Sequence, residues 1–198
     1  METYVDPAVS RAKFEREIAL YRQIEDAHLR RGWWLLKASY PEVFVVFACQ
    51  RTKPTAIIFG ALLDFTDYDF RPPSVRLVHP LTRVPYKFKE LPTVFKRTVL
   101  APNPPELAAQ GLMSVTEQIL MVAHHEDDIP FFCIPGVREY HAHPGHSGDI
   151  WELHRNTGVG TLNFLLTQMS KYGVEPVTGF NVAMNVVVTG FQQTSPPQ

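Results

Sequence analysis

The chain is poor in cysteine: Cys49 and Cys133 are the two among 198 residues. Two cysteines in a chain of this length do not make a disulfide framework, and they favour a reducing compartment such as the cytosol. No apolar run approaches the roughly 20 residues that a membrane-spanning helix needs. The first residues, METYVDPAVSRAKFE, contain neither an apolar core segment nor a cleavage pattern, so no signal peptide is expected. We therefore predict a cytoplasmic protein without a membrane segment.

Charge of one sign is also lacking. Lys and Arg number 19 against 20 Asp and Glu, which gives a formal net charge of −1. Because no basic block is present, the electrostatic footprint of a nucleic-acid-binding protein is missing, and we expect no nucleic-acid partner. The composition, with 45% hydrophobic and 20% charged residues, is ordinary for a globular protein. A length of 198 residues fits a single domain over 1–198.

Proline is abundant. The chain contains 17 prolines, and they cluster at 72–73, at 80–105 and at 130–144. Such clusters indicate loops and short elements, because proline fixes φ and removes a backbone donor. We therefore expect a long proline-rich insertion at about 80–130.

The N-terminal part carries clear element signals. Asp6-Pro7 is a typical helix start, with Asp as the N-cap and Pro at the first helical position. Apolar residues recur from there at three- and four-residue spacing and Gly32 supplies a stop, which predicts a helix of about 24 residues. Runs rich in β-branched and aromatic residues then predict antiparallel strands at 33–39, 43–49, 57–65 and 74–78.

Two more helices are predicted in the second half. In MSVTEQILMVAHHEDD, residues 113–128, Ser114 is a candidate N-cap and Glu117 completes a capping box. Thr161 can cap the other helix, LNFLLTQMSKYG, in which the leucines share one face. VAMNVVV at 182–188 suits a final strand or a buried segment. This order of elements predicts an α+β fold, with helices segregated from an antiparallel sheet.

The segment 131–155 concentrates groups that bind metals or move protons. These groups are Cys133, Glu139, His141, His143, His146, Asp149, Glu152 and His154. In an extended strand Glu139, His141 and His143 point to one face because side chains alternate. Cys133 or His146 can then close a tetrahedron, and a mixed set of S, N and O ligands suits zinc best. Asp149, Glu152 or His154 can orient the ligand histidines.

The first eighty residues resemble a ubiquitin-conjugating-enzyme fold. Domains of that fold begin with an amphipathic helix and continue through an antiparallel meander, a Tyr-Pro loop and a Pro-Pro dipeptide. Here FGALLDFTDYDFRPPSVRLVHP places Tyr68 and Pro72-Pro73 at the corresponding points. The resemblance implies a single ubiquitin-conjugating-enzyme-like domain, with an N-terminal helix, a sheet meander and a C-terminal helix.

In that fold a His-Pro-Asn motif precedes the catalytic cysteine by several residues, and helices follow. The best match in this sequence is HPGHSGDIWEL, where His143-Pro144-Gly145 stands in place of His-Pro-Asn. The cysteine position then falls near Trp151, and tryptophan cannot accept an acyl group. On this alignment the resemblance implies a homologue of ubiquitin-conjugating enzymes that lacks the usual nucleophile.

The residues from Cys133 and Glu139 to the following histidines also resemble a narrower family. This is the predicted metal-binding family of bacterial ubiquitin-like operons that is named CEHH for its Cys, Glu, His, His pattern. Its members are encoded beside a ubiquitin-like protein, an activating-enzyme homologue and a JAB-type peptidase. The resemblance implies a bound metal, with the ubiquitin-like protein and its activating-enzyme homologue as partners.

Several interpretations of the segment stay open. We favour the first, a metal-stabilised adaptor without catalysis; the second is an active carrier that uses Cys133 or a zinc-activated water. The third is a stand-alone zinc hydrolase with Glu139 or Glu152 as its base. The plainest is a polar loop without any ligand. Burial of Cys133 in its apolar run FFCI argues against a nucleophile, because burial raises a thiol pKa.

Overall fold

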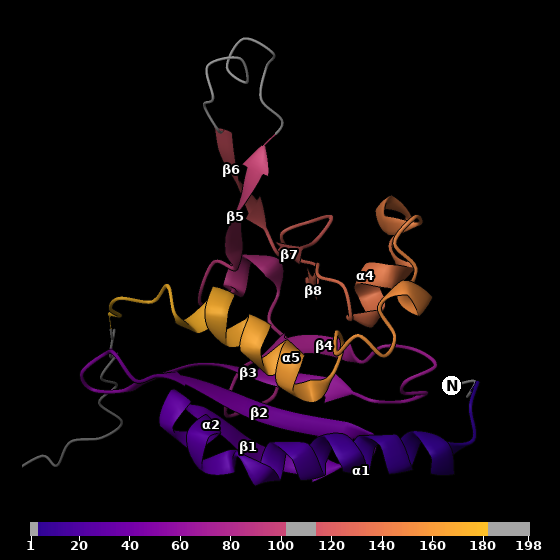
Figure 1. Ribbon diagram of the computed structural model, residues 1–198. Coiled ribbons are helices and arrows are strands. Elements are labelled where there is room, and N and C mark those ends of the chain that lie inside the picture. The colour runs from indigo at the N-terminus through magenta and orange to yellow at the C-terminus, as the bar shows by residue number, and fades with distance from the viewer. Residues whose placement is uncertain (1–3, 102–113, 182–198) are drawn as a thin grey trace, which may run out of the picture.

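A computed structural model describes residues 4–101 and 114–181 and has an α+β fold, as predicted (Figure 1). A four-stranded antiparallel sheet is preceded along the chain by two helices and followed by two more. Its strands are β1 Trp33–Ser39, β2 Glu42–Cys49, β3 Ala56–Asp64 and β4 Ser74–Val78, in the order β1-β2-β3-β4. The helices are α1 Pro7–Gln23, α2 Glu25–Arg31, α4 Arg138–Ala142 and α5 Leu162–Met169, the last continued by the π-helical turn η4 Ser170–Val174.

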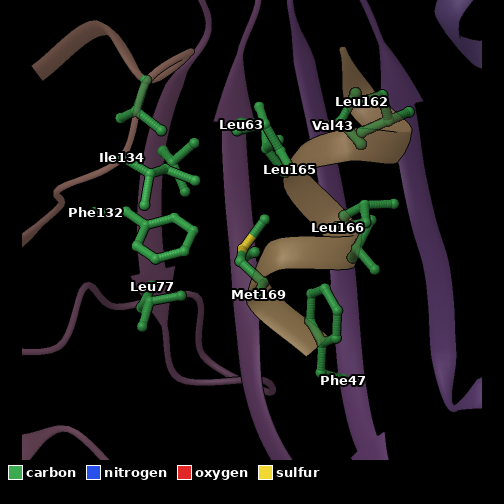
Figure 2. Close-up of a cluster of buried hydrophobic side chains, with 14 of the residues drawn as sticks. Val43, Phe47, Leu63, Leu77, Phe132, Ile134, Leu162, Leu165, Leu166 and Met169 are labelled. Atoms are coloured by element: carbon green, nitrogen blue, oxygen red, sulfur yellow. The ribbon is translucent and has the colours of Figure 1, made fainter. Parts of the chain in front are cut away.

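The helix α5 covers one face of the sheet and closes the main core. Its leucines and Met169 lie over the strands, together with side chains from β2, β3 and β4 (Figure 2). Thr161 caps the helix as predicted, because its hydroxyl accepts from the backbone N–H of Phe164. Phe14 and Tyr21 of α1 belong to the same core, so the helices from both ends of the chain share one hydrophobic cluster.

The opposite face of the sheet carries a smaller apolar cluster. Phe44, Val46 and Val78 are buried there, with Trp34 and Leu62 packed against them. β2 is therefore buried on both faces, which explains its near-continuous apolar run.

The predicted N-terminal helix is present but interrupted. Asp6 caps α1 by accepting from Ala8 N–H, and Pro7 is its first residue. The helix breaks at Ile24, where φ is −125°, and α2 resumes at Glu25. Gly32 then ends α2 in the left-handed conformation at φ 83°, as its position after the apolar stripe predicts.

The predicted helix at 113–128 is wrong. Ser114–Ile119 forms β6, which pairs antiparallel with β5 Lys96–Ala101, and the two strands project as a ribbon from the rest of the fold (Figure 1). Met121–Val122 forms β7, which pairs with β8 Phe131–Phe132. The insertion also holds a short 3-10 turn, η1 Phe88–Glu90. The local capping-box signal favours a helix, but pairing with β5 stabilises a strand instead. Such pairing depends on residues far away in the sequence.

The extended strand expected for Glu139, His141 and His143 is also wrong. Residues 138–142 form α4, and Pro144 begins the 3-10 turn η2 Pro144–His146, which η3 Trp151–Leu153 follows. Glu139 and His141 are two steps of about 100° apart around the axis of α4, and His143 lies beyond its end, so the three residues do not share one face. The candidate strand at 182–188 lies outside the described residues. Among the described helices, none is long and apolar enough to cross a membrane.

His28 lies in the core beside the break between α1 and α2. Its ring is stacked between those of Tyr21 and Trp33, with centroids 4.5 and 4.8 Å away. In the part of the chain that the structure describes, neither ring nitrogen has a hydrogen-bond partner. Burial, aided by the charge of Arg31, lowers the pKa of His28. The folded protein therefore holds this imidazole in its neutral form.

Acid should destabilise the fold through His28. An unfolded histidine titrates near pH 6.5, and the folded pKa is lower, so the unfolded state takes up the proton more readily. The stability contributed by neutral His28 is present above about pH 6.5 and is lost as the pH falls toward the folded pKa. We expect the urea midpoint of the wild type to fall between about pH 7.5 and about pH 5.5. This fall should be smaller in His28→Phe, whose ring fills the same space without titrating.

His125→Phe is the matched control, because His125 is exposed on the loop between β7 and β8. It should keep the pH dependence of the wild type. An unchanged fall of the urea midpoint in His28→Phe would contradict the assignment to His28.

Candidate functional site

Arg138 fixes α4 against the sheet. Its guanidinium donates to the carbonyl of Thr66 at 2.6 Å and to that of Pro72 at 3.1 Å. It also forms an ion pair with the carboxylate of Asp64 at 3.4 Å. The backbone N–H of Arg138 donates to the carbonyl of Pro73 at 2.9 Å. The residues that follow Arg138 are thereby placed relative to β3 and β4.

Cys133 lies at a tight turn just after β8. Its N–H donates to the carbonyl of Leu120 at 2.7 Å, and the N–H of Ile134 donates back to the carbonyl of Phe132 at 3.0 Å. Phe132 and Ile134 are buried in the main core, where they lie beside Leu77 (Figure 2). The backbone of Cys133 is therefore held between two core anchors.

The thiol of Cys133 contacts His146. The distance from Sγ to Nε2 is 3.3 Å, although the two residues are separated by α4 and most of η2. Burial raises the pKa of the Cys133 thiol, and the charge of Arg97 opposes that rise. The resting pair is thus a neutral thiol beside an imidazole that can accept its proton.

Tyr140 and Asp149 connect this pair to the loop that follows. The rings of Tyr140 and His146 are stacked, with centroids 3.9 Å apart and planes at 23°. The Tyr140 hydroxyl donates to Oδ2 of Asp149 at 2.6 Å, and Nε2 of His154 donates to Oδ1 at 2.5 Å. Burial, and next the bond to Asp149, raise the pKa of Tyr140 to about 12. The bonds from Tyr140 and His154 lower the pKa of Asp149, which therefore stays ionised.

His141 has no ring nitrogen left for a metal. Nδ1–H donates to the carbonyl of Asp149 at 2.7 Å, and Nε2 accepts from the N–H of Gly136 at 3.0 Å. These partners fix one neutral tautomer, and burial lowers the pKa of the ring. His141 therefore acts as a bridge between two backbone segments.

Glu139 is likewise engaged, on the side of β4. One carboxylate oxygen accepts from the hydroxyl of Ser74 and lies 3.4 Å from the guanidinium of Arg76. The other oxygen is buried without a hydrogen-bond partner among the described residues.

His143 lies beside His146 but is tied into the local turn. Its ring centroid is 5.5 Å from that of His146, and 5.4 Å from that of Phe131. Its Nδ1 accepts from the N–H of Gly145 at 3.1 Å, which caps η2. In the neutral ring the proton then sits on Nε2, which makes this nitrogen a donor rather than a ligand.

The predicted zinc ligands are thus divided by the fold. Within residues 4–101 and 114–181, no three His, Cys, Asp or Glu side chains are placed to hold one metal ion. The contact of 3.3 Å between Cys133 Sγ and His146 Nε2 fits a shared ion, because a zinc-bound sulfur and nitrogen at tetrahedral angles lie about 3.5 Å apart. The zinc site stays a prediction. Of its five predicted ligands, Cys133 and His146 lie in contact with each other. Tyr140 was missed, since a lone aromatic residue in the sequence gives no signal of stacking.

Trp151, where the sequence placed the missing cysteine, is structural. Its side chain is buried, and Nε1–H donates to the carbonyl of Asp69 at 2.8 Å. Gly160 packs so closely against the ring that a Cβ at this position would lie 2.8 Å from it. The indole therefore fixes the loop before α5 to the segment that precedes β4.

Comparison with known proteins gives a family for the whole arrangement. The family model described as Y4jH-like matches residues 5–177, which include the sheet, the Cys133–His146 pair and α5. The uncharacterized protein y4jH of Sinorhizobium fredii (strain NBRC 101917 / NGR234) is 42% identical over 199 residues, covering 98% of this chain and 95% of its own. The chain belongs to the Y4jH-like family.

Proposed function

We propose that this chain is a ubiquitin-conjugating-enzyme-like component of a bacterial ubiquitin-like conjugation pathway. It binds the ubiquitin-like protein or its activating-enzyme homologue, and Cys133 carries the ubiquitin-like protein as a thioester. The observation that carries this proposal is the distance of 3.3 Å between Sγ of Cys133 and Nε2 of His146. An imidazole in contact with a thiol is the arrangement that activates cysteine nucleophiles.

The order of elements supports Cys133 as the carrier. The first helices, the meander and Pro72-Pro73 before β4 occur in the sequence expected of the resembling fold. In that fold a histidine motif precedes the cysteine by several residues and helices follow. Here α4 and α5 follow Cys133, whereas the best match to the motif, His143-Pro144-Gly145, comes after it. Trp151, in contrast, is held in the fold by its own packing and hydrogen bond.

The chemistry is a transfer between two sulfurs. Nε2 of His146 takes the proton of Cys133 while the sulfur attacks the thioester carbonyl carbon that the activating enzyme presents. A new C–S bond forms at Cys133, the C–S bond to the activating enzyme breaks, and the departing thiolate takes the proton from His146. Because burial raises the pKa of Cys133, the base has to act at the moment of attack rather than through a resting ion pair.

A second candidate is the zinc-binding adaptor without catalysis. Burial of the Cys133 thiol favours it, since a thiol with a raised pKa is a poor nucleophile. Cys133 and His146 supply the soft sulfur and nitrogen donors that zinc prefers. On this proposal the protein acts only by binding the ubiquitin-like protein or the activating enzyme. The zinc hydrolase is less well supported, because Glu139 is bound to Ser74 and Arg76.

A transfer assay separates the two candidates. The purified chain is mixed with the ubiquitin-like protein, its activating-enzyme homologue and ATP, and the products are run on non-reducing gels. We expect an adduct that thiol reductants release, that is lost in Cys133→Ala and that is kept in the matched control Cys49→Ala. His146→Ala should slow its formation by about 10²–10⁴-fold, the usual contribution of a general base.

Binding of the partner without any adduct would overturn the carrier role and favour the adaptor. Absence of both binding and adduct would overturn the pathway assignment itself.

The zinc candidate makes a different prediction about His141. Zinc affinity, measured by competition with a chromophoric chelator, should fall in Cys133→Ala and His146→Ala but stay unchanged in His141→Ala. His141→Ala should instead lower the free energy of unfolding by about 1–3 kcal/mol, because Gly136 N–H and the Asp149 carbonyl lose their partner. His125→Ala is the exposed control for both measurements.

Loss of zinc from a stable His141→Ala protein would restore His141 as a ligand. If the purified protein carries no zinc and chelators leave its melting temperature unchanged, the zinc candidate fails.

A further inference from the structure

The ring of His146 has few constraints of its own. It sits at the end of the three-residue turn η2 and is half-exposed. In the described structure its one side-chain hydrogen bond is to Sγ of Cys133. A single hydrogen bond does not fix the plane of an imidazole, so the ring could rotate away from the thiol. Another contact has to select the orientation that faces Cys133.

Tyr140 provides that contact. Its ring lies 3.9 Å from the ring of His146 at 23°, closer than the ring of His143, which lies 5.5 Å away and tilted by 50°. Stacked rings contribute specific orientation as well as contact area. The stack therefore restricts His146 to a plane in which Nε2 meets the sulfur.

Tyr140 is itself fixed at both ends. Its backbone belongs to α4, which Arg138 attaches to the sheet. Its hydroxyl donates to Asp149, whose other oxygen is occupied by His154. A side chain that is buried and anchored in this way is a rigid platform, unlike the short turn that carries His146.

We propose that Tyr140 is a positioning residue, whose ring holds His146 in the orientation that serves the Cys133 thiol. The proposal rests on the proposed function, because it takes the Cys133–His146 pair as the reactive unit. Asp149 acts one step farther away, through the hydroxyl of Tyr140. The hydrogen bonds of Tyr140 and Asp149 go to each other and to His154, and the hydrogen bond to the sulfur comes from His146, so both residues act through His146.

The test measures how Cys133 reacts with iodoacetamide across a pH series, in a Cys49→Ala background and without any partner protein. His146→Ala defines the rate without the base. We expect this rate to be about tenfold below that of the wild type near neutral pH. A rise of one unit in the thiol pKa lowers the thiolate fraction by that factor. The rate of Tyr140→Leu should equal that of His146→Ala at each pH of the series. The double variant should show no further loss, because both changes remove one interaction.

The conservative variant provides the rescue. Tyr140→Phe keeps the ring but loses the hydroxyl. Its rate should stay within about fivefold of the wild type, because the free energy of one hydrogen bond corresponds to a change of about that size. Tyr172→Leu, on η4 away from the pair, is the matched control and should react like the wild type.

A folded Tyr140→Leu protein with the wild-type profile would overturn the proposal, whereas an unchanged rate in His146→Ala would overturn the Cys133–His146 pair of the proposed function. A measurement on the wild type keeps the proposal testable if Tyr140→Leu does not fold. The ring protons of His146 should resonate upfield because they lie over the Tyr140 ring. Unshifted resonances would overturn the stacking role.

Discussion

The attachment of α4 by Arg138 is the contact on which the candidate site depends. One guanidinium reaches three carbonyls and a carboxylate between Asp64, the last residue of β3, and Pro72 in the connection to β4. Charge-assisted hydrogen bonds of this kind are stronger than neutral ones, and the fork geometry of Arg makes them directional. Because α4 is so short, this anchor sets where each of its side chains points. Glu139 meets β4, His141 meets the loop, and Tyr140 faces His146.

The N-terminal half could be read from the sequence because its signals are local. Asp6, Pro7 and Gly32 mark helix ends by their own backbone preferences, and the strands alternate or run apolar according to the faces they bury. The ribbon could not be read in this way. Ser114–Ile119 carries a capping box, yet it pairs with Lys96–Ala101 across an intervening stretch of chain. Local sequence signals do not identify the partner of a strand, so they cannot predict pairing of this kind.

The site was predicted in part, and for a reason that proved wrong. The sequence names Cys133 and His146 as alternative ligands to complete a set whose other members, Glu139, His141 and His143, share one face of an extended strand. The chain instead makes a helical turn and then a 3-10 turn, which brings His146 back to the thiol. Alternation in the sequence cannot distinguish these outcomes, because the five residues of α4 are too few to show a period. The stack of Tyr140 on His146 depends on that return and had no sequence signal.

The same burial that fixes Cys133 also makes it unreactive on its own. Phe132 and Ile134 anchor the turn in the core, and the resulting loss of solvent raises the pKa of the thiol. Any chemistry at this sulfur, whether attack on a thioester or binding of a metal, requires loss of its proton. His146 is the group in contact that can take it. The reactivity of the site therefore depends less on the cysteine than on how firmly the imidazole is held, and in this fold that is decided by the aromatic ring beneath it.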